Sequence, residues 1–274
     1  MVSISAIVVF DIDGVIRDVS GSYRRALADT VEYFTNGAYR PSQVDIDTLK
    51  SEGIWNNDWE ASRELICRYF EAQGLRSSFS LDYEAVIAFF QSRYRGADLN
   101  NPDHWTGYIC QEPLLLQSKY LEQLTQAGIA WGFFSGATRG SASYVLERRL
   151  GLQSPVLVAM EDAPGKPDPI GLFNVVHQLE SQNPSGVSSP VIYVGDTVAD
   201  MQTVERARLQ ETSEAKTFQP KRPWIGVGVL PPHAQTPPDY ARNYATKLQQ
   251  AGAAIVLETI EQLTLAKIQQ LTET

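Results

Sequence analysis

Hydrophobic residues occur along the chain as short continuous runs, separated by longer stretches in which they recur at helical spacing. The first run, residues 6–10, ends at Asp11 and is apolar at every position. Such a run is typical of a strand in a parallel sheet, because helices cover both of its faces. The alternation of these runs with helical sequence predicts an α/β fold. Comparable runs occupy residues 129–134, 156–160, 191–195, 224–230 and 253–257.

The stretches between the predicted strands carry signals for helix ends and loops. Gly128 and Gly151 each follow apolar residues at helical spacing, and glycine at such a position commonly ends a helix. The polar segments 181–190 and 209–223 contain Ser or Pro and are predicted to be loops. Nothing in the sequence indicates what residues 209–222 do.

Residues 19–109 differ from the rest because they contain no comparable strand-like run. Their apolar residues recur at helical spacing, in stretches that end near Gly37, Gly74 and Gly96. The pattern predicts an all-helical domain, residues 19–109, inserted into an α/β core made of residues 1–18 and 110–274.

Composition and charge limit the kinds of partner and the cellular compartment that fit this sequence. The 274 residues include 23 Lys and Arg against 32 Asp and Glu, a net charge of −9, which argues against nucleic-acid binding. The apolar runs are far shorter than the roughly 20 residues that a membrane span needs. Cys67 and Cys110 form no CxxC pattern, and the N-terminus lacks the basic segment of a signal peptide. We therefore expect a cytoplasmic protein without a membrane or nucleic-acid partner; its oligomeric state is not indicated.

Residues able to do chemistry follow the predicted strands in a fixed order. Each also has a purely structural interpretation: an acidic residue after a strand can cap a turn, a serine or aspartate can stabilise a helix start, and a loop lysine is usually solvated. Their common position at strand ends favours chemistry, because ligands of α/β sheets bind there. They are Asp11 and Asp13; Ser135 and Gly136; Lys166 in Gly-Lys-Pro-Asp-Pro; and Asp196 and Asp200.

In this order the residues resemble the four motifs of the haloacid dehalogenase superfamily, over the entire chain. The inserted helical domain is similar to the cap that one branch of this superfamily carries between its first and second motifs. The resemblance implies a Rossmann-like parallel-sheet core with a helical cap. It also implies a phosphatase that hydrolyses a small phosphorylated metabolite through an aspartyl-phosphate intermediate.

Asp11 and Asp13 suit this reaction by their chemistry. A phosphate monoester dianion resists an anionic nucleophile, so the site must supply positive charge, in-line geometry and a proton for the leaving oxygen. Asp11 is the candidate nucleophile, and Asp13 the candidate general acid and later general base. A dehalogenase needs no such proton donor, so Asp13 favours phosphoryl transfer.

Several carboxylates converging on a dianion require a divalent cation, and oxygen ligands suit a hard one such as Mg²⁺. The resemblance implies that Asp11, Asp196 and the backbone carbonyl of Asp13 bind Mg²⁺. Asp200 would lie outside the metal's own ligands and orient Lys166 or a metal-bound water. Lys166 would neutralise the phosphoryl oxygens.

The resemblance further implies that the Ser135 hydroxyl and the Gly136 amide bind a phosphoryl oxygen. The inserted domain would then recognise the leaving group, and Arg24, Trp55, Asn57 and Trp59 are its candidate specificity residues. Packing between helices and helix capping are alternative roles for the last three. A phosphomutase of the same superfamily and a non-catalytic binding or regulatory module remain alternative functions.

Overall fold

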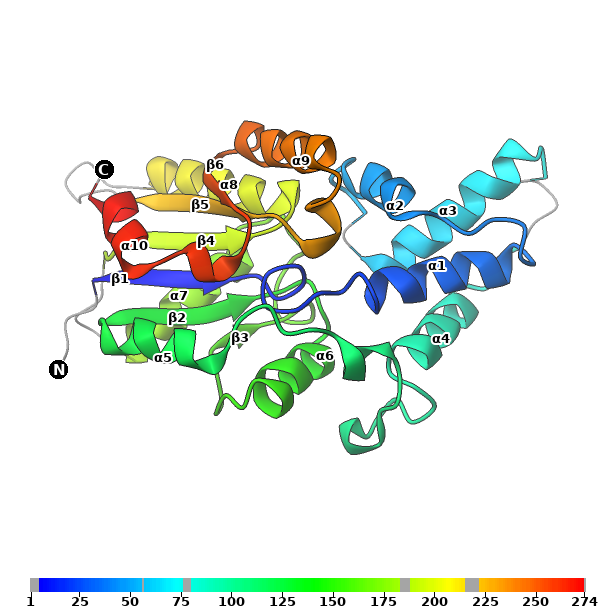
Figure 1. Cartoon of the computed structure of the whole chain (residues 1–274), viewed down its shortest axis with the longest axis horizontal. Helices are drawn as coiled ribbons and strands as arrows, with labels where there is room; N and C mark the ends of the chain where they lie inside the picture. Colours follow the sequence, from blue (N-terminus) through cyan, green and yellow to red (C-terminus); the bar gives the residue numbers. More distant parts are fainter. Residues whose placement is uncertain (1–4, 56, 76–79, 183–187, 215–221, 274) are drawn as a thin grey trace. The chain divides into compact units, whose positions relative to one another are not determined.

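One parallel sheet of six strands forms the centre of the described α/β part of the chain, in the order β3-β2-β1-β4-β5-β6 (Figure 1). This is the strand order of a Rossmann fold, so the predicted fold class is confirmed. The computed structural model describes residues 5–55, 57–75, 80–182, 188–214 and 222–273. The strands are β1 (Ala6–Phe10), β2 (Ile129–Phe134), β3 (Leu157–Val158), β4 (Val191–Gly195), β5 (Trp224–Val229) and β6 (Ala253–Leu257).

The chain divides into two units, each with its own contacts. The core unit comprises Met1–Asp18 and Leu114–Thr274, and the helical unit comprises Val19–Pro113. The core unit contains the sheet together with α5 (Ser118–Gln126), α6 (Arg139–Ser143), the π-helical turn η4 (Tyr144–Arg149), α7 (Ile170–Gln182), α8 (Val198–Glu214), η6 (Pro232–Ala234), α9 (Pro238–Gln250), η7 (Ile260–Gln262) and α10 (Leu265–Thr272).

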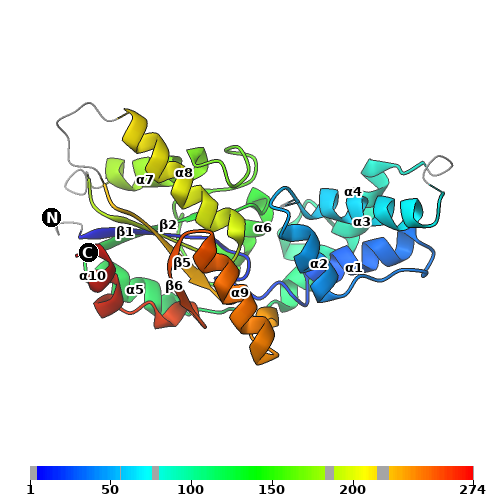
Figure 2. The same cartoon turned by 90° about the horizontal axis from the view of Figure 1, so that it is seen from above.

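Both faces of the sheet are covered, which explains why β1 is apolar throughout. Ile7 and Val9 pack into a cluster with residues of α7 and α8 on one face. Val8 and Phe10 pack into a second cluster with residues of α5, α6 and α10 on the other (Figure 2). All five residues of β1 are buried. Burial on two faces is what a central strand of a parallel sheet requires.

The register of the central strands brings their carboxyl ends to one edge. Phe10 at the end of β1 pairs with Phe133 of β2 and with Val194 of β4. The backbone N–H of Asp11 donates to the Val194 carbonyl at 2.8 Å, so pairing continues to the first predicted site residue. The strand order reverses between β1 and β4, and such a point in an α/β sheet favours ligand binding.

The helical unit contains α1 (Tyr23–Phe34), α2 (Gln43–Lys50), α3 (Asp58–Ala72), α4 (Tyr83–Tyr94) and the short 3₁₀ turns η2 (Pro102–His104) and η3 (Tyr108–Gln111). Its aromatic residues pack together: the centroid of the Tyr23 ring lies 4.0 Å from that of the Tyr94 ring and 5.6 Å from that of the Phe90 ring. The sequence patterns did not predict α2. Its signal is the capping box, in which Ser42 and Asp45 each bond the other's backbone N–H.

The predicted loop at 209–223 is wrong in its first half, because α8 continues to Glu214. Residues 208–211 are Arg, Leu, Gln and Glu, which favour helix. The helix is also held to β5, since Arg208 Nη2 donates to the Trp224 carbonyl at 2.7 Å. Likewise, α7 includes residues 181 and 182 of the predicted loop 181–190. Residues 183–187 and 215–221 of these segments lie outside the described residues.

A helix that crosses a membrane must be both long and apolar. Among the described residues, no helix meets both requirements.

Candidate active site

Asp11 begins the loop after β1 and is buried at the sheet edge, with 6% of its surface exposed. Its Oδ1 accepts a hydrogen bond from the Ile12 backbone N–H at 2.8 Å and lies 2.8 Å from Nζ of Lys166. The backbone N–H of Asp11 donates to the Val194 carbonyl of β4, and this hydrogen bond fixes the backbone of Asp11. Both the position and the orientation of this carboxyl group are therefore set by the core unit.

Lys166 is largely buried between two carboxylates and is not a solvated loop lysine. Its side chain is 8% exposed, and Nζ lies 2.8 Å from Asp11 Oδ1 and 2.7 Å from Asp200 Oδ1. The rings of Phe134 and Tyr193 flank the ammonium group at 5.3 and 5.5 Å. Burial by itself lowers the pKa of Lys166, but Asp11 and Asp200 raise it further than burial lowers it. The lysine therefore carries a fixed positive charge next to Asp11.

Asp200 is fully buried, and hydrogen bonds reach both of its carboxylate oxygens. Oδ1 accepts from the Tyr193 hydroxyl at 3.0 Å and contacts Lys166. Oδ2 accepts from the backbone N–H and the hydroxyl of Thr197 at 2.9 and 2.6 Å, at the start of α8. Burial raises the pKa of Asp200, but Lys166 and Thr197 lower it more, and the net direction is down. Asp200 thus both stabilises the start of α8 and holds Lys166.

The sequence patterns did not single out Tyr193 as a site residue. It lies in β4, its hydroxyl bonds Asp200, and burial together with Asp200 raises its pKa well above the usual range. A polar side chain within a fully buried strand was the available signal, because a buried hydroxyl needs a partner. Tyr193 connects the interior of the sheet to the carboxylate that holds Lys166.

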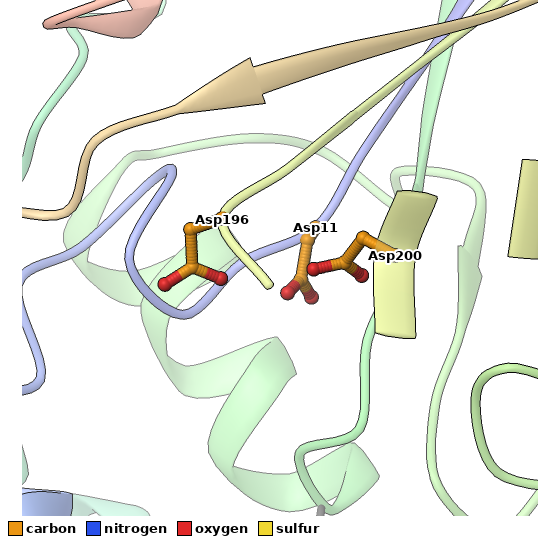
Figure 3. Close-up of side chains that lie close together, drawn as sticks. All are labelled: Asp11, Asp196 and Asp200. Carbon is orange, nitrogen blue, oxygen red and sulfur yellow. The ribbon is translucent and has the colours of Figure 1, made fainter. Parts of the chain in front are cut away.

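Asp196 directly follows β4, and its carboxyl group joins those of Asp11 and Asp200. One carboxylate oxygen from each of the three lies within 4.8 Å of the others (Figure 3). Burial raises the pKa of Asp11 to about 7; Lys166 opposes this, and the negative charges of Asp200 and Asp13 add to it. Lys166 contacts Asp11 and Asp200, so three buried carboxyl groups lie together beside a single ammonium group, and the excess negative charge favours a bound cation.

A divalent metal fits this cluster, because all of its donors are hard carboxylate oxygens. Both oxygens of Asp200 already accept hydrogen bonds from neighbouring side chains. Asp11 and Asp196 are consequently the residues best able to bind the metal directly. Asp200 is better suited to orienting Lys166.

Ser135 follows β2, the neighbour of β1, and is 1% exposed. Its N–H donates to the Val158 carbonyl at 3.0 Å, and its Oγ accepts from the Ala137 N–H at 3.1 Å. Ser135 does not cap α6, which begins at Arg139 with Thr138 as its N-cap. Gly136 beside it is exposed, with nothing within 4 Å of the position that a Cβ atom would take. Asp13 lies two residues after Asp11, with its side chain 28% exposed.

The four candidate specificity residues lie in the helical unit, and the described contacts of Arg24, Trp55 and Asn57 are to that unit. Arg24 is 7% exposed and forms an ion pair with Asp47. Trp55 Nε1 donates to Glu52 Oε2 at 2.8 Å. Asn57 is the N-cap of α3, because its Oδ1 accepts from the N–H groups of Trp59 and Glu60 at 2.9 and 3.4 Å. Their roles toward a substrate stay predictions.

Comparison with known proteins gives relatives by sequence and by fold. A protein of Phytophthora nicotianae named imidazoleglycerol-phosphate dehydratase is 29% identical over 262 residues. The alignment covers 90% of this chain and 49% of that protein, so the chain spans about half the length of this relative.

Solved structures share the fold at low identity. A phosphonoacetaldehyde hydrolase-like protein from Oleispira antarctica has a TM-score of 0.67 and 17% identity, covering 99% of this chain and 93% of the other. The phosphatase Tt82 from Thermococcus thioreducens has a TM-score of 0.57 and 24% identity, covering 74% and 88%. A β-phosphoglucomutase from Clostridium difficile has a TM-score of 0.55 and 16% identity, covering 98% and 97%.

The family match covers most of the chain. The haloacid dehalogenase-like hydrolase family matches residues 6–208, a range that includes all four motif segments. The resemblance seen in the motifs is therefore confirmed at the level of the family. The chain belongs to the haloacid dehalogenase-like hydrolases.

Proposed function

We propose that the protein is a Mg²⁺-dependent phosphatase that hydrolyses a small-molecule phosphate monoester through an aspartyl-phosphate intermediate. The observation that carries the proposal is the pair formed by Asp11 and Lys166, a buried carboxylate and a buried ammonium 2.8 Å apart at the end of β1. A nucleophile held beside a fixed positive charge suits attack on a phosphate dianion, since the charge offsets the repulsion between the two anions.

Asp11 and Asp196, with the backbone carbonyl of Asp13, would hold Mg²⁺. Bound there, the ion would neutralise charge on the phosphoryl oxygens. Lys166 would neutralise further charge, and the Ser135 hydroxyl and Gly136 amide would hold another phosphoryl oxygen. Asp200, supported by Tyr193 and Thr197, would keep Lys166 in place.

In the first half-reaction the Asp11 carboxylate attacks phosphorus while the bond to the leaving oxygen breaks. Asp13 donates its proton to that oxygen, so the alcohol leaves neutral. In the second half-reaction Asp13 takes a proton from water, which attacks the aspartyl phosphate. Inorganic phosphate leaves and the Asp11 carboxylate is regenerated, so the net reaction is hydrolysis of the ester.

The name of one relative suggests a further ester to assay. The Phytophthora relative is named for a substrate that is itself a phosphate ester bearing an imidazole ring. An imidazole-bearing alcohol phosphate therefore belongs among the esters to be assayed, beside sugar phosphates, phosphoglycolate, nucleotides and amino-alcohol phosphates. Arg24, Trp55, Asn57 and Trp59 remain the proposed specificity residues of the helical unit.

The test is release of inorganic phosphate from this panel by the purified protein, with and without Mg²⁺. We expect metal-dependent release from at least one ester, and a loss of at least about 100-fold in the Asp11→Asn variant. Asp239→Asn is the matched control, because Asp239 lies exposed in α9. Turnover by Asp11→Asn at the wild-type rate would exclude the proposed nucleophile.

Two outcomes separate the alternatives. Conversion of a sugar monophosphate to its isomer, dependent on a bisphosphate activator and without net phosphate release, would indicate a phosphomutase. Failure to release phosphate from every ester in the presence of Mg²⁺ would favour a non-catalytic binding or regulatory module.

A further inference from the structure

Arg17 is a charged side chain with no exposed surface, in the loop that carries Asp11 and Asp13. Its Nε and Nη2 each lie 2.6 Å from Oδ1 of Asp13. Burying a guanidinium group is costly unless an anion compensates for the lost hydration. Asp13, with its side chain 28% exposed, supplies that anion and extends from the buried arginine toward the surface.

Backbone hydrogen bonds also hold Arg17 in place. The Gly14 N–H donates to the Arg17 carbonyl at 2.9 Å, and the Arg17 N–H donates to the Ile12 carbonyl at 3.2 Å. Leu114, where the chain returns to the core unit, forms a β-bridge with Arg17. A planar guanidinium on so constrained a backbone has few alternative orientations, and it can therefore fix the carboxyl group that it contacts.

The two carboxylate oxygens of Asp13 differ in their contacts. Both Arg17 contacts fall on Oδ1, and within the described residues no hydrogen bond reaches Oδ2. An aspartate side chain can rotate about two bonds, and a clamp on one oxygen selects one of its orientations. The other oxygen is then presented in a constant position.

We propose that Arg17 is a positioning residue, which holds the Asp13 carboxyl group so that Oδ2 exchanges the proton with the leaving group and with water. This inference rests on the proposed phosphatase function and adds a residue that the four motifs do not include. Arg17 acts through Asp13 and need not touch the substrate.

The leaving group provides the test, because esters differ in their need for a proton. p-Nitrophenolate leaves readily without one, whereas the alkoxide of glycerol 2-phosphate requires it. The value of kcat/KM reports the steps up to cleavage of the ester bond. We expect Arg17→Met to lower kcat/KM for glycerol 2-phosphate at least about tenfold more than for p-nitrophenyl phosphate. An equal fall for both esters would overturn the proposal.

Two further variants distinguish a catalytic effect from a folding defect. Arg17→Lys keeps a buried positive charge but lacks the planar fork, so it should show the same selective loss to a smaller degree. If Arg17→Met does not fold, Arg17→Lys carries the comparison. Arg222→Met is the matched control: it removes another largely buried arginine of the core unit, ion-paired with Glu180, and should lower stability without changing the ratio for the two esters.

A double-mutant cycle with Asp13→Asn shows whether Arg17 acts through Asp13. In the Asp13→Asn background, Arg17→Met should change the ratio of the two kcat/KM values by less than about twofold. A full, additional selective loss in that background would overturn the proposal. Wild-type protein that hydrolyses neither ester, nor any other in the panel, would instead overturn the phosphatase function, and this inference with it.

Discussion

Gly14 and Asp196 are in such close contact that a Cβ atom on residue 14 would lie 2.0 Å from Oδ2 of Asp196. Gly14 also has a φ of +74°, in the left-handed region that favours glycine. The loop after β1 and the loop after β4 therefore approach each other at a position without a side chain. The absence of a side chain at residue 14 leaves room for the Asp196 carboxyl group, which lies near that of Asp11.

Gly14→Ala should displace the Asp196 carboxyl group and weaken both metal binding and turnover. We expect at least about a tenfold loss of Mg²⁺ affinity and of kcat, in addition to about 1–2 kcal/mol of backbone strain. Calorimetric titration and phosphate release measure these effects. Gly151→Ala is the matched control, since Gly151 has a φ of +77° and nothing within 4 Å of its Cβ position. Unchanged Mg²⁺ affinity in Gly14→Ala would show that Asp196 does not bind the metal.

Tyr193→Phe should lower kcat by about tenfold, the effect of losing one hydrogen bond to a charged group. The change keeps the aromatic ring beside Lys166 and removes only the hydroxyl that donates to Asp200 at 3.0 Å. Tyr120→Phe is the comparison, because its hydroxyl donates to the Leu263 carbonyl at 2.8 Å elsewhere in the core unit. If Tyr193→Phe had the kcat of the wild type, Tyr193 would not be needed to position Lys166.

The stability of the metal-free protein should fall as pH rises from about 4 to about 7. Burial raises the pKa of Asp11 from 3.8 to about 7, so in this range the folded state binds a proton that the unfolded state releases. Bound protons then favour folding, and the advantage is lost as pH rises through the folded-state pKa. Urea unfolding in the presence of a chelator measures the trend. Asp11→Asn should flatten it, whereas Asp239→Asn should not.

Mg²⁺ should reduce the loss of stability that is expected as pH rises from about 4 to about 7, because the ion binds the ionised carboxylates of the folded state. The increase in Tm on adding Mg²⁺ should be larger near about pH 8 than near about pH 5, and it should be absent in Asp11→Asn. A similar increase in Tm for Asp11→Asn would place the metal elsewhere.

Asn57→Ala should destabilise the protein by about 1 kcal/mol, because it removes the N-cap of α3. Asn57→Ser should retain most of the stability, since serine supplies a capping oxygen. Thermal unfolding separates the two variants. The KM of the same variants, for the ester that the wild type hydrolyses fastest, tests whether Asn57 also binds substrate. An increase in KM in both variants would assign Asn57 to substrate binding. An unchanged KM would show that Asn57 acts only as a helix cap.

Local sequence pattern was enough to predict the α/β class, the helical character of the segment between β1 and β2, and the order of the site residues along the chain. A strand buried on both faces is apolar throughout, and the motif residues of the core unit lie at or soon after the ends of such apolar runs. The capping box at Ser42 was also readable, although α2 was not predicted from it. The end of α8 was misjudged, because polar residues such as Gln210 and Glu211 suit a helix as well as a loop.

The contacts between individual side-chain atoms arise from the way the elements pack and the loops turn. Asp200 could be recognised as acidic in sequence, but its hydrogen bond to Tyr193 depends on how the chain turns from β4 into α8. Its ion pair with Lys166 depends on the loop after β3, which returns Lys166 to the sheet edge. The clamp of Arg17 on Asp13 likewise depends on how the chain turns within one loop. Periodicity reports which face of an element is buried, whereas distances between side chains on different elements arise from packing, which no local pattern encodes.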